Sequence, residues 1–560
     1  MKNKDKYKMN RLAVVVSISI AIVLSSCNDL EQEPTHEFTE ANYWTSPQDA
    51  MGMLSRAYSQ MYDAGYMFST ECLSDNVFQR RPSDEKTITS GLADASNGRF
   101  QREWNDSYRC IKTCHILLAN IESVPMDPEL KARVIAETRF IRAFSFFRLT
   151  TWFGDVPHFT TDISLEESRN VTRKPQAEVL TWIRAELEDI KEILPKREEY
   201  SLADRGRITR GAAAMLLART YLYVRMPDTE WEKVRDICRD IMDGVYGHYE
   251  LFPSYEGIFT AENQYNSEII LDIQYVPRLR TWDNMQDLIP RAAGARVNGF
   301  APTQELVDDY INIGFGSLSP GAPFASLDPR LIQTVVNHGY RWQMPDGEYI
   351  TIEIDPLTTA VNAPDRYKPA SDETPTGYFL RKWYDITYTG DNIASGMNII
   401  LMRYADVLLM YAEAKNELGE FNQTVWEETI VPLRERAAVT TEIWNSNSND
   451  YELTLIEFGP MALQYPSVAT QEMRQTILRR ERRAELAIEG TRVFDLRRWG
   501  TAVEVLNGSA HGARFANNNT ENIRLEPIRR FDPLRDYLWA IPQLERDRVG
   551  HDKLTQNPRY

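Results

Sequence analysis

Residues 136–149 read AETRFIRAFSFFRL and form the centre of the stretch, residues 127–152, that decides the fold of this chain. Small and aromatic residues recur three or four positions apart at Ala132, Ala136, Phe140, Phe144 and Phe147. Apolar residues at this spacing fall on one face of an α-helix. The stretch therefore predicts a long helix whose apolar face packs against other helices.

Similar patterns recur on both sides of this stretch. Further helices are expected over residues 45–62, 102–121, 176–194, 209–223, 230–242, 402–418, 424–438 and 471–488. Helices in pairs, with alanine at close approaches and larger apolar side chains between them, stack as tetratricopeptide-type repeats do. The sequence predicts a mostly α-helical protein with a tetratricopeptide-like helical-repeat scaffold.

Residues 249–399 differ in character from the helical segments. Proline, glycine, asparagine and aromatic residues become more frequent, and long helical periods are absent. Within this segment, residues 340–354 alternate apolar and polar side chains after an Asp346-Gly347 pair, which favours a β-hairpin. We expect an irregular, loop-rich insertion lobe that contains this short hairpin and carries the binding function, because long loops on a scaffold often do.

The first 27 residues, MKNKDKYKMNRLAVVVSISIAIVLSSC, have the layout of an export signal. A basic segment precedes an apolar run that is too short to span a bilayer, and small residues lead into Cys27. This ending resembles a bacterial lipobox, in which the cysteine is lipidated and becomes the first mature residue. We expect residues 1–26 to be removed and residues 27–40 to form a lipidated acidic tether that anchors the protein without spanning the membrane. A signal peptide with an incidental cysteine is the alternative.

The 560-residue chain carries a formal net charge of −17. Such a surface repels phosphate backbones and anionic lipid headgroups, so we expect no nucleic-acid partner and membrane contact through the lipid anchor only. The hydrophobic share of 42 % is ample for a large core.

Four further cysteines follow Cys27. Export permits disulfides among them. Cys110, Cys114 and His115 lie close together, but no further metal ligands are near them. We therefore predict small buried thiols rather than a metal site, and no cofactor. The four cysteines are Cys72, Cys110, Cys114 and Cys238.

Five blocks of sequence carry a family resemblance. They are residues 136–157, 206–222, 401–416, 479–500, and the closing segments 538–542 and 554–560. In this order, behind a lipobox, they resemble the SusD/RagB family of nutrient-binding outer-membrane lipoproteins over essentially the whole mature chain.

The resemblance implies a helical scaffold in residues 41–248, a variable ligand-binding lobe in residues 249–399, and a scaffold completed by residues 400–560. It implies a cell-surface lipoprotein that captures a glycan and caps a SusC-like TonB-dependent outer-membrane transporter. The acidic residues Asp29, Glu31 and Glu33 resemble the surface-export signal of several Bacteroidetes lipoproteins. Some relatives capture peptides, so a peptide- or protein-binding surface scaffold is the alternative function.

Sugar binding requires flat aromatic platforms with polar side chains beside them. Aromatic residues in irregular, polar stretches are therefore candidates, and Trp282 is the first choice because Asp283 and Asn284 follow it. A loop tryptophan is about as often a packing residue, since tryptophan is highly buried on average. The candidate ligand-binding residues are Trp282, Trp342, Tyr66, Phe78, Tyr275, Asp283, Asn284, Arg280 and Arg296.

Four arginines flank Trp282 in this otherwise acidic chain. One hypothesis is that they contact an anionic group on the ligand, such as a uronate. Ion pairing with the surrounding acids is the slightly favoured alternative. The four are Arg278, Arg280, Arg291 and Arg296.

Glu481, Glu485 and Glu489 recur every four residues on one predicted helix face. Paired carboxylates carry out glycoside hydrolysis, but arginines hold carboxylates ionised, which is wrong for a general acid. We therefore predict a structural ion-pair network. The sequence also has no nucleophile elbow and no zinc-protease motif, and it predicts a binding protein rather than an enzyme. The arginines near the three glutamates are Arg479, Arg482, Arg492, Arg497 and Arg498.

Overall fold

The computed structural model describes residues 43–226, 228–315, 328–368, 374–387, 394–445, 448, 450–515 and 523–560. The predicted signal peptide, Cys27 and the acidic tether lie outside the described residues.

The stretch that opens the sequence analysis forms α7 (Pro128–Phe153). Asp127 caps its N-terminus by accepting hydrogen bonds from the backbone of Glu129 and Leu130, each at 3.0 Å. The helix ends at Gly154, whose φ of +71° few other residues adopt. The phenylalanine stripe is buried against neighbouring helices. The predicted helix is therefore confirmed.

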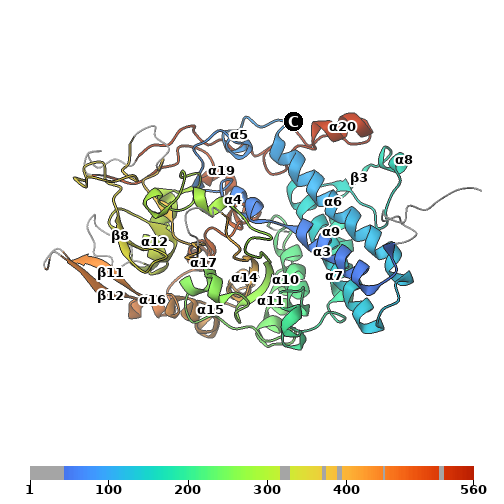
Figure 1. Ribbon diagram of the computed structural model, residues 1–560, viewed down its shortest axis with the longest axis horizontal. Coiled ribbons are helices and arrows are strands. Elements are labelled where there is room, and N and C mark those ends of the chain that lie inside the picture. The colour runs from blue at the N-terminus through green and yellow to red at the C-terminus, as the bar shows by residue number, and fades with distance from the viewer. Residues whose placement is uncertain are drawn as a thin grey trace, which may run out of the picture.

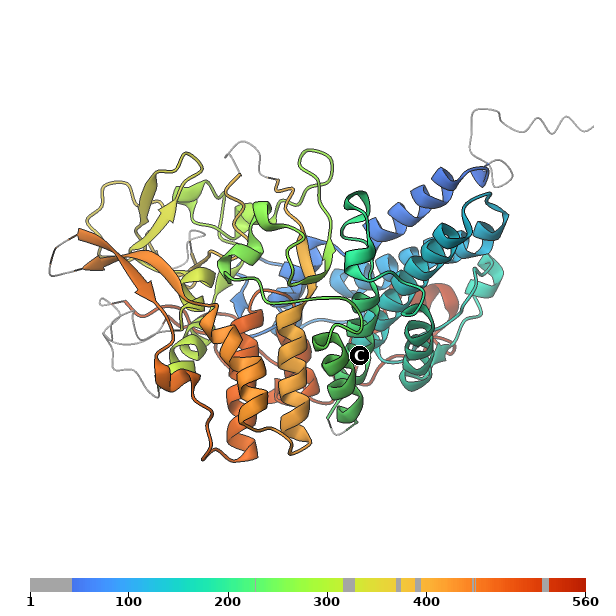
Figure 2. The same ribbon diagram turned by 90° about the horizontal axis from the view of Figure 1, so that it is seen from below.

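The first group of long helices stacks in sequence order. Each helix packs against the next, and Figures 1 and 2 show α3, α6, α7 and α9 at one end of the molecule, with α10 and α11 nearer its middle. They are α3 (Pro47–Met61), α6 (Gly98–Asn120), α7, α9 (Gln176–Ile190), α10 (Arg210–Leu222) and α11 (Trp231–Met242).

The stack continues with α14 (Tyr404–Glu417), which packs against α11 although about 160 residues separate them in the sequence. It then adds α15 (Gln423–Glu435) and α17 (Gln471–Leu486), both in contact with α14. The protein is mostly α-helical, and its paired helices agree with the predicted tetratricopeptide-like scaffold. The residues between α11 and α14 form a segment inserted between two helices of the stack.

A two-stranded sheet pairs the beginning of this inserted segment with its end. Strand β4 (Ile269–Ile273) pairs antiparallel with β10 (Ile399–Arg403), with Ile273 opposite Ile399. Farther out, β7 (Tyr340–Gln343) pairs with β8 (Tyr349–Ile352) across a turn at Gly347, whose φ is +89°. The predicted hairpin is confirmed. The segment also contains α12 (Gln304–Phe315), which the sequence analysis did not anticipate.

A second hairpin lies in the part expected to be helical. Strands β11 (Val439–Asn445) and β12 (Asp450–Ile456) pair antiparallel over seven residues each. Figure 1 shows them projecting at the end opposite α6 and α7. The helices expected after residue 400 leave residues 439–470 unassigned, so the sequence analysis did not predict this hairpin, although its alternating β-branched and aromatic residues favour strands over a helix.

The remaining elements are short. They are α4 (Ala64–Glu71), α5 (Asp84–Thr89), α8 (Leu165–Ser168), α13 (Arg330–Thr334), α16 (Pro460–Leu463), α18 (Arg492–Arg498), α19 (Ala502–Val505), α20 (Gln543–Val549), and the strand pairs β1 (Val77–Phe78) with β5 (Ala301–Pro302), β2 (Val156–Pro157) with β3 (Arg173–Lys174), and β6 (Val335–Val336) with β9 (Phe379–Leu380).

The three glutamates of the α17 segment are buried in ion pairs. Glu481 lies 2.8 Å from Arg330, and Glu489 lies 2.8 Å from Arg403. Burial opposes ionisation of Glu485, but the neighbouring arginines outweigh burial and hold its pKa well below the usual range. The predicted structural network is confirmed.

Its partners differ from those expected. The glutamates pair with residues from α13, β10, α15 and the segments beside them rather than with arginines close in sequence. The nearby Arg482 binds Asp406 and Asp495 instead, and Arg498 binds Glu413. The network therefore joins the helical stack to the inserted segment.

The four cysteines that the structure describes are free and buried, as predicted for small thiols. Among the described helices, none combines the length and apolar character needed to cross a bilayer.

Candidate ligand-binding cleft

Both candidate tryptophans are core residues. Trp282 is 5 % exposed, its indole nitrogen donates to the carbonyl of Met397 at 2.8 Å, and its ring lies 5.6 Å from that of Phe68. Trp342 is fully buried beside Tyr384, with ring centres 4.5 Å apart. The structure corrects the expectation that these rings are open sugar platforms.

The three other aromatic candidates are also buried. The hydroxyl of Tyr66 donates to Asp106 at 2.5 Å, and the hydroxyl of Tyr275 accepts from the backbone nitrogen of Ala64 at 2.8 Å. Phe78 belongs to a small apolar cluster with Ala510 and Leu525, separate from the main core. These side chains therefore stabilise the fold through contacts with residues distant in sequence. Such contacts cannot be predicted from the local sequence pattern.

The polar candidates are more accessible. Asp283 and Arg296 are exposed, and Asn284 is half-buried. Arg280 donates to the carbonyl of Gln274 at 2.9 Å, so part of its guanidinium is bound within the loop. The structure does not gather these residues with the buried aromatic candidates into one open site.

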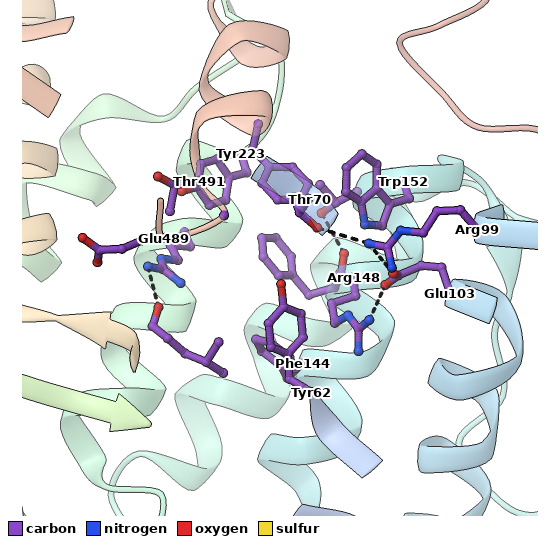
Figure 3. Close-up of a pocket in the computed structure, with 16 residues that line it drawn as sticks. Tyr62, Thr70, Arg99, Glu103, Phe144, Arg148, Trp152, Tyr223, Glu489 and Thr491 are labelled. Atoms are coloured by element: carbon purple, nitrogen blue, oxygen red, sulfur yellow. Dashed lines mark hydrogen bonds and ion pairs between the residues drawn. The ribbon is translucent and has the colours of Figure 1, made fainter. Parts of the chain in front are cut away.

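A small cavity, of about 80 Å³, lies among α6, α7, α10 and the segment after α17 (Figure 3). Figure 3 shows Arg99 and Arg148 pointing toward Glu103, and the ion-pair distances are 3.4 and 2.5 Å. A volume of this size holds a few water molecules. We therefore assign this cavity to the structural ion network rather than to a ligand.

A larger cleft opens where the helical scaffold meets strand β4. Its volume is about 370 Å³, within the range of small-molecule sites. One wall comes from the connection between α9 and α10, and the other comes from β4 and the loop before it. Its lining includes Arg197, Arg205, Gly206, Tyr265 and Asp272.

Gly206 allows the loop and the wall of this cleft to pack closely together. Its φ is +81°, and a Cβ atom added there would lie 1.5 Å from the side-chain nitrogen of Gln274 and 3.0 Å from the ring of Tyr265. Gln274 in turn donates to the carbonyl of Arg205 at 2.7 Å. Only glycine permits this close approach of loop and wall.

Tyr265 occupies a strained backbone conformation beside Gly206. Its φ of +66° is rare for a bulky residue. Arg197 fixes this backbone by donating to the carbonyls of Tyr265 and Asn266 at 2.7 and 2.8 Å. A strained residue held in place by its surroundings is typical of a functional site.

Asp272 is a buried carboxylate in the wall of the cleft. It is 3 % exposed, and its Oδ2 accepts from the side-chain nitrogen of Asn398 at 2.8 Å. Among the residues that the structure describes, Oδ1 has no hydrogen-bond partner. Burial raises the pKa of Asp272 to about 6, while Asn398 and Arg197 counteract part of that effect.

Sequence reasoning missed Arg205, Tyr265 and Asp272. One signal was present, since Asp272 is the single acid in the apolar strand IILDI, residues 269–273. Gly206 also stands at the start of a block that the family resemblance used. The strain at Tyr265 has no signature in the sequence.

Comparison with known proteins defines the family. Residues 256–560 match the model of the SusD family, and residues 31–222 match a model described as starch-binding associating with outer membrane. This chain therefore belongs to the SusD family, which confirms the resemblance found in its sequence.

Individual relatives extend over nearly the whole chain. SusD-like protein P25 of Formosa agariphila is 26 % identical over 96 % of this chain and 98 % of its own length. The crystal structure of a SusD-like carbohydrate binding protein from Bacteroides fragilis aligns with a TM-score of 0.77 at 27 % identity, covering 90 % of this chain and 99 % of that one. A laminarin binding SusD-like protein shares the fold, with a TM-score of 0.63 at 21 % identity over 92 % of this chain and all of its own.

Proposed function

We propose that this protein is a cell-surface glycan-binding lipoprotein that captures an oligosaccharide or polysaccharide and delivers it to a TonB-dependent outer-membrane transporter. The observation that carries the proposal is the SusD-family match together with the end-to-end structural likeness to a carbohydrate binding relative. The cleft beside β4 supports it, because its volume and polar lining suit a sugar residue.

The proposed position on the cell surface rests on the sequence before the described residues. Cys27 would carry the lipid, and Asp29, Glu31 and Glu33 would direct the anchor to the outer face of the outer membrane. A Cys27→Ala change should abolish surface display while leaving glycan binding by the purified protein intact. Loss of binding in this variant would contradict the division between anchor and binding domain.

The proposed function is binding without catalysis. The three glutamates of the α17 segment are ionised and enclosed by cations, so they cannot supply a proton to a leaving sugar. We expect no release of reducing ends when the protein is incubated with the polysaccharides that it binds. Release of reducing sugar above the buffer control would contradict this part of the proposal.

A glycan array probed with the mature chain, purified from residue 28 onward, tests the proposed ligand class. Retention of one group of related glycans supports the proposal, and an array without retained glycans overturns it. Co-purification from outer membranes tests delivery, with a TonB-dependent transporter as the expected partner.

Peptide or protein binding is the second candidate. It is favoured by β12, which leaves Leu453 and Leu455 exposed by 75 and 54 % on one face of a projecting hairpin. A Leu453→Ser change should leave glycan retention unaltered but weaken binding of a protein partner. A peptide array run beside the glycan array distinguishes the two functions.

A further inference from the structure

We infer that the cleft beside β4 binds an acidic sugar residue, with Asp272 accepting its hydroxyl groups and Arg205 with Arg197 binding its carboxylate or sulfate. This inference rests on the proposed glycan-binding function and adds the location and charge of the sugar. It differs from the hypothesis for the arginines around Trp282, none of which lines this cleft.

The first argument is the state of Asp272. Buried carboxylates normally have their oxygens satisfied, because an unused acceptor away from water costs free energy. Asn398 satisfies only Oδ2, and Oδ1 has no hydrogen-bond partner within the described part of the chain. Sugar hydroxyls are the donors that such an acceptor binds. Asp272 lies in an apolar strand, where a carboxylate does not improve the packing.

The second argument is the charge of the arginines. Arg207 is neutralised by Glu137 at 3.0 Å and Asp204 at 2.8 Å. By contrast, Arg197 donates its hydrogen bonds to backbone carbonyls, and no ion pair within 4.0 Å joins Arg197 or Arg205 to a carboxylate among the described residues, although Glu198 also lines the cleft. Arg205 is exposed, so its guanidinium is free to meet a ligand. Guanidinium groups bind carboxylates and sulfates strongly, since both hydrogen bonds are charge-assisted.

The third argument is the shape of the wall between these charges. Tyr265 is half-buried and lines the cleft beside Gly206, where the side chain of Gln274 packs against the loop. An aromatic ring in the wall of a cleft offers an apolar surface for the C–H groups of a sugar ring. The hydrogen bond from Arg197 to its carbonyl keeps Tyr265 in position. The carboxylate of Asp272, the guanidinium of Arg205 and the ring of Tyr265 thus line the same cleft.

The test compares matched ligands. Each acidic oligosaccharide on the array is paired with its own neutral form, made by carboxyl reduction of a uronate chain or by desulfation of a sulfated chain. We expect the wild-type protein to bind the acidic form at least tenfold more tightly in low salt, and the advantage to shrink as salt rises. The uronate and sulfate pairs distinguish which anionic group is recognised.

Two variants then locate the site. Arg205→Gln should lower affinity for the acidic ligand by about tenfold, as for a lost charged hydrogen bond, and should reduce the salt dependence. Asp272→Asn should lower affinity for the acidic and the neutral forms alike, because it changes the group that accepts hydrogen bonds from the sugar hydroxyls. Arg56→Gln, an exposed arginine on α3 that does not line the cleft, is the matched control and should bind as wild type does.

The possible failures are distinguishable. If the protein binds glycans but prefers the neutral members of each pair, or if both cleft variants bind as wild type does, this inference is overturned and the proposed function stands. If it binds no glycan, both are overturned. Melting temperatures of all three variants identify any loss of binding that arises from unfolding.

Discussion

Asn398 donates a 2.8 Å hydrogen bond to one carboxylate oxygen of Asp272, while the other oxygen has no partner among the described residues. The pair links the two strands, β4 and the approach to β10, that close the base of the inserted segment. A buried carboxylate that is half satisfied destabilises the fold. A ligand that donates a hydrogen bond to the unpaired oxygen would offset this cost in the bound protein.

The first prediction concerns stability and pH. Because the pKa of Asp272 is raised from 3.8 to about 6, the folded protein between these values holds a proton that the unfolded chain has lost. The contribution of this residue to stability therefore falls as the pH rises from about 4 to about 6, and above this range it costs about 2–3 kcal/mol.

Asp272→Asn keeps an acceptor for Asn398 and removes the charge. It should raise the free energy of unfolding at pH 8 by about 2 kcal/mol and change it little at pH 4, as measured by urea denaturation. A variant less stable than wild type at pH 8 would show that the carboxylate has a structural role.

The second prediction concerns Gly206. Gly206→Ala places a methyl group against Gln274 and Tyr265 in addition to straining a backbone with φ of +81°. Gly339→Ala is the matched control, since Gly339 also has φ of +81° but nothing within 4 Å of the added Cβ. Strain alone should cost about 1–2 kcal/mol in the control. The Gly206 variant should cost more and also lose glycan affinity; equal losses in the two variants would contradict the close approach.

The third prediction concerns Trp282. Replacing this buried ring by alanine leaves a cavity and an unpaired carbonyl at Met397. We expect Trp282→Ala to lower stability by about 3–5 kcal/mol. Thermal unfolding followed by circular dichroism measures the loss. An unchanged melting temperature with reduced glycan affinity would instead restore Trp282 as a ligand platform.

The fourth prediction concerns the glutamate network. Glu485→Gln removes the buried carboxylate that Arg330, Arg403 and Arg436 share. The buried cluster then holds an uncompensated positive charge, so the change should cost about 3–5 kcal/mol. Glu428→Gln breaks an exposed pair with Arg239 and should cost under about 1 kcal/mol. Chemical denaturation measures the free energy of unfolding of both variants. A loss at Glu485 as small as that at Glu428 would contradict the claim that the glutamate network stabilises the contact between the helical stack and the inserted segment.

Sequence periodicity predicted the helical scaffold closely. The helix expected over residues 176–194 is α9 (Gln176–Ile190), and the one expected over 471–488 is α17 (Gln471–Leu486). Such helices follow from local spacing of apolar residues. The hairpin of β11 and β12 was missed, although the polar turn NSNSND at residues 445–450 lies between two alternating segments.

The candidate site was less predictable because burial in an irregular segment depends on distant partners. Trp282 is in the core since its backbone bridges to Ser395, more than a hundred residues away. Asp272 and Arg205 line the same cleft, yet their sequence positions give no reason to connect them. The sequence offered a positive ligand site only as a hypothesis for the arginines around Trp282, and only the fold brings Asp272 and Arg205 together.

The proposed glycan site is the cleft beside β4. A crystal structure of the mature protein with the oligosaccharide best retained on the array tests it most directly. We expect one sugar residue in the cleft, with a hydroxyl within hydrogen-bond distance of Oδ1 of Asp272 and an anionic group bound to Arg205. A sugar bound elsewhere on the protein, with the cleft holding only solvent, would contradict it.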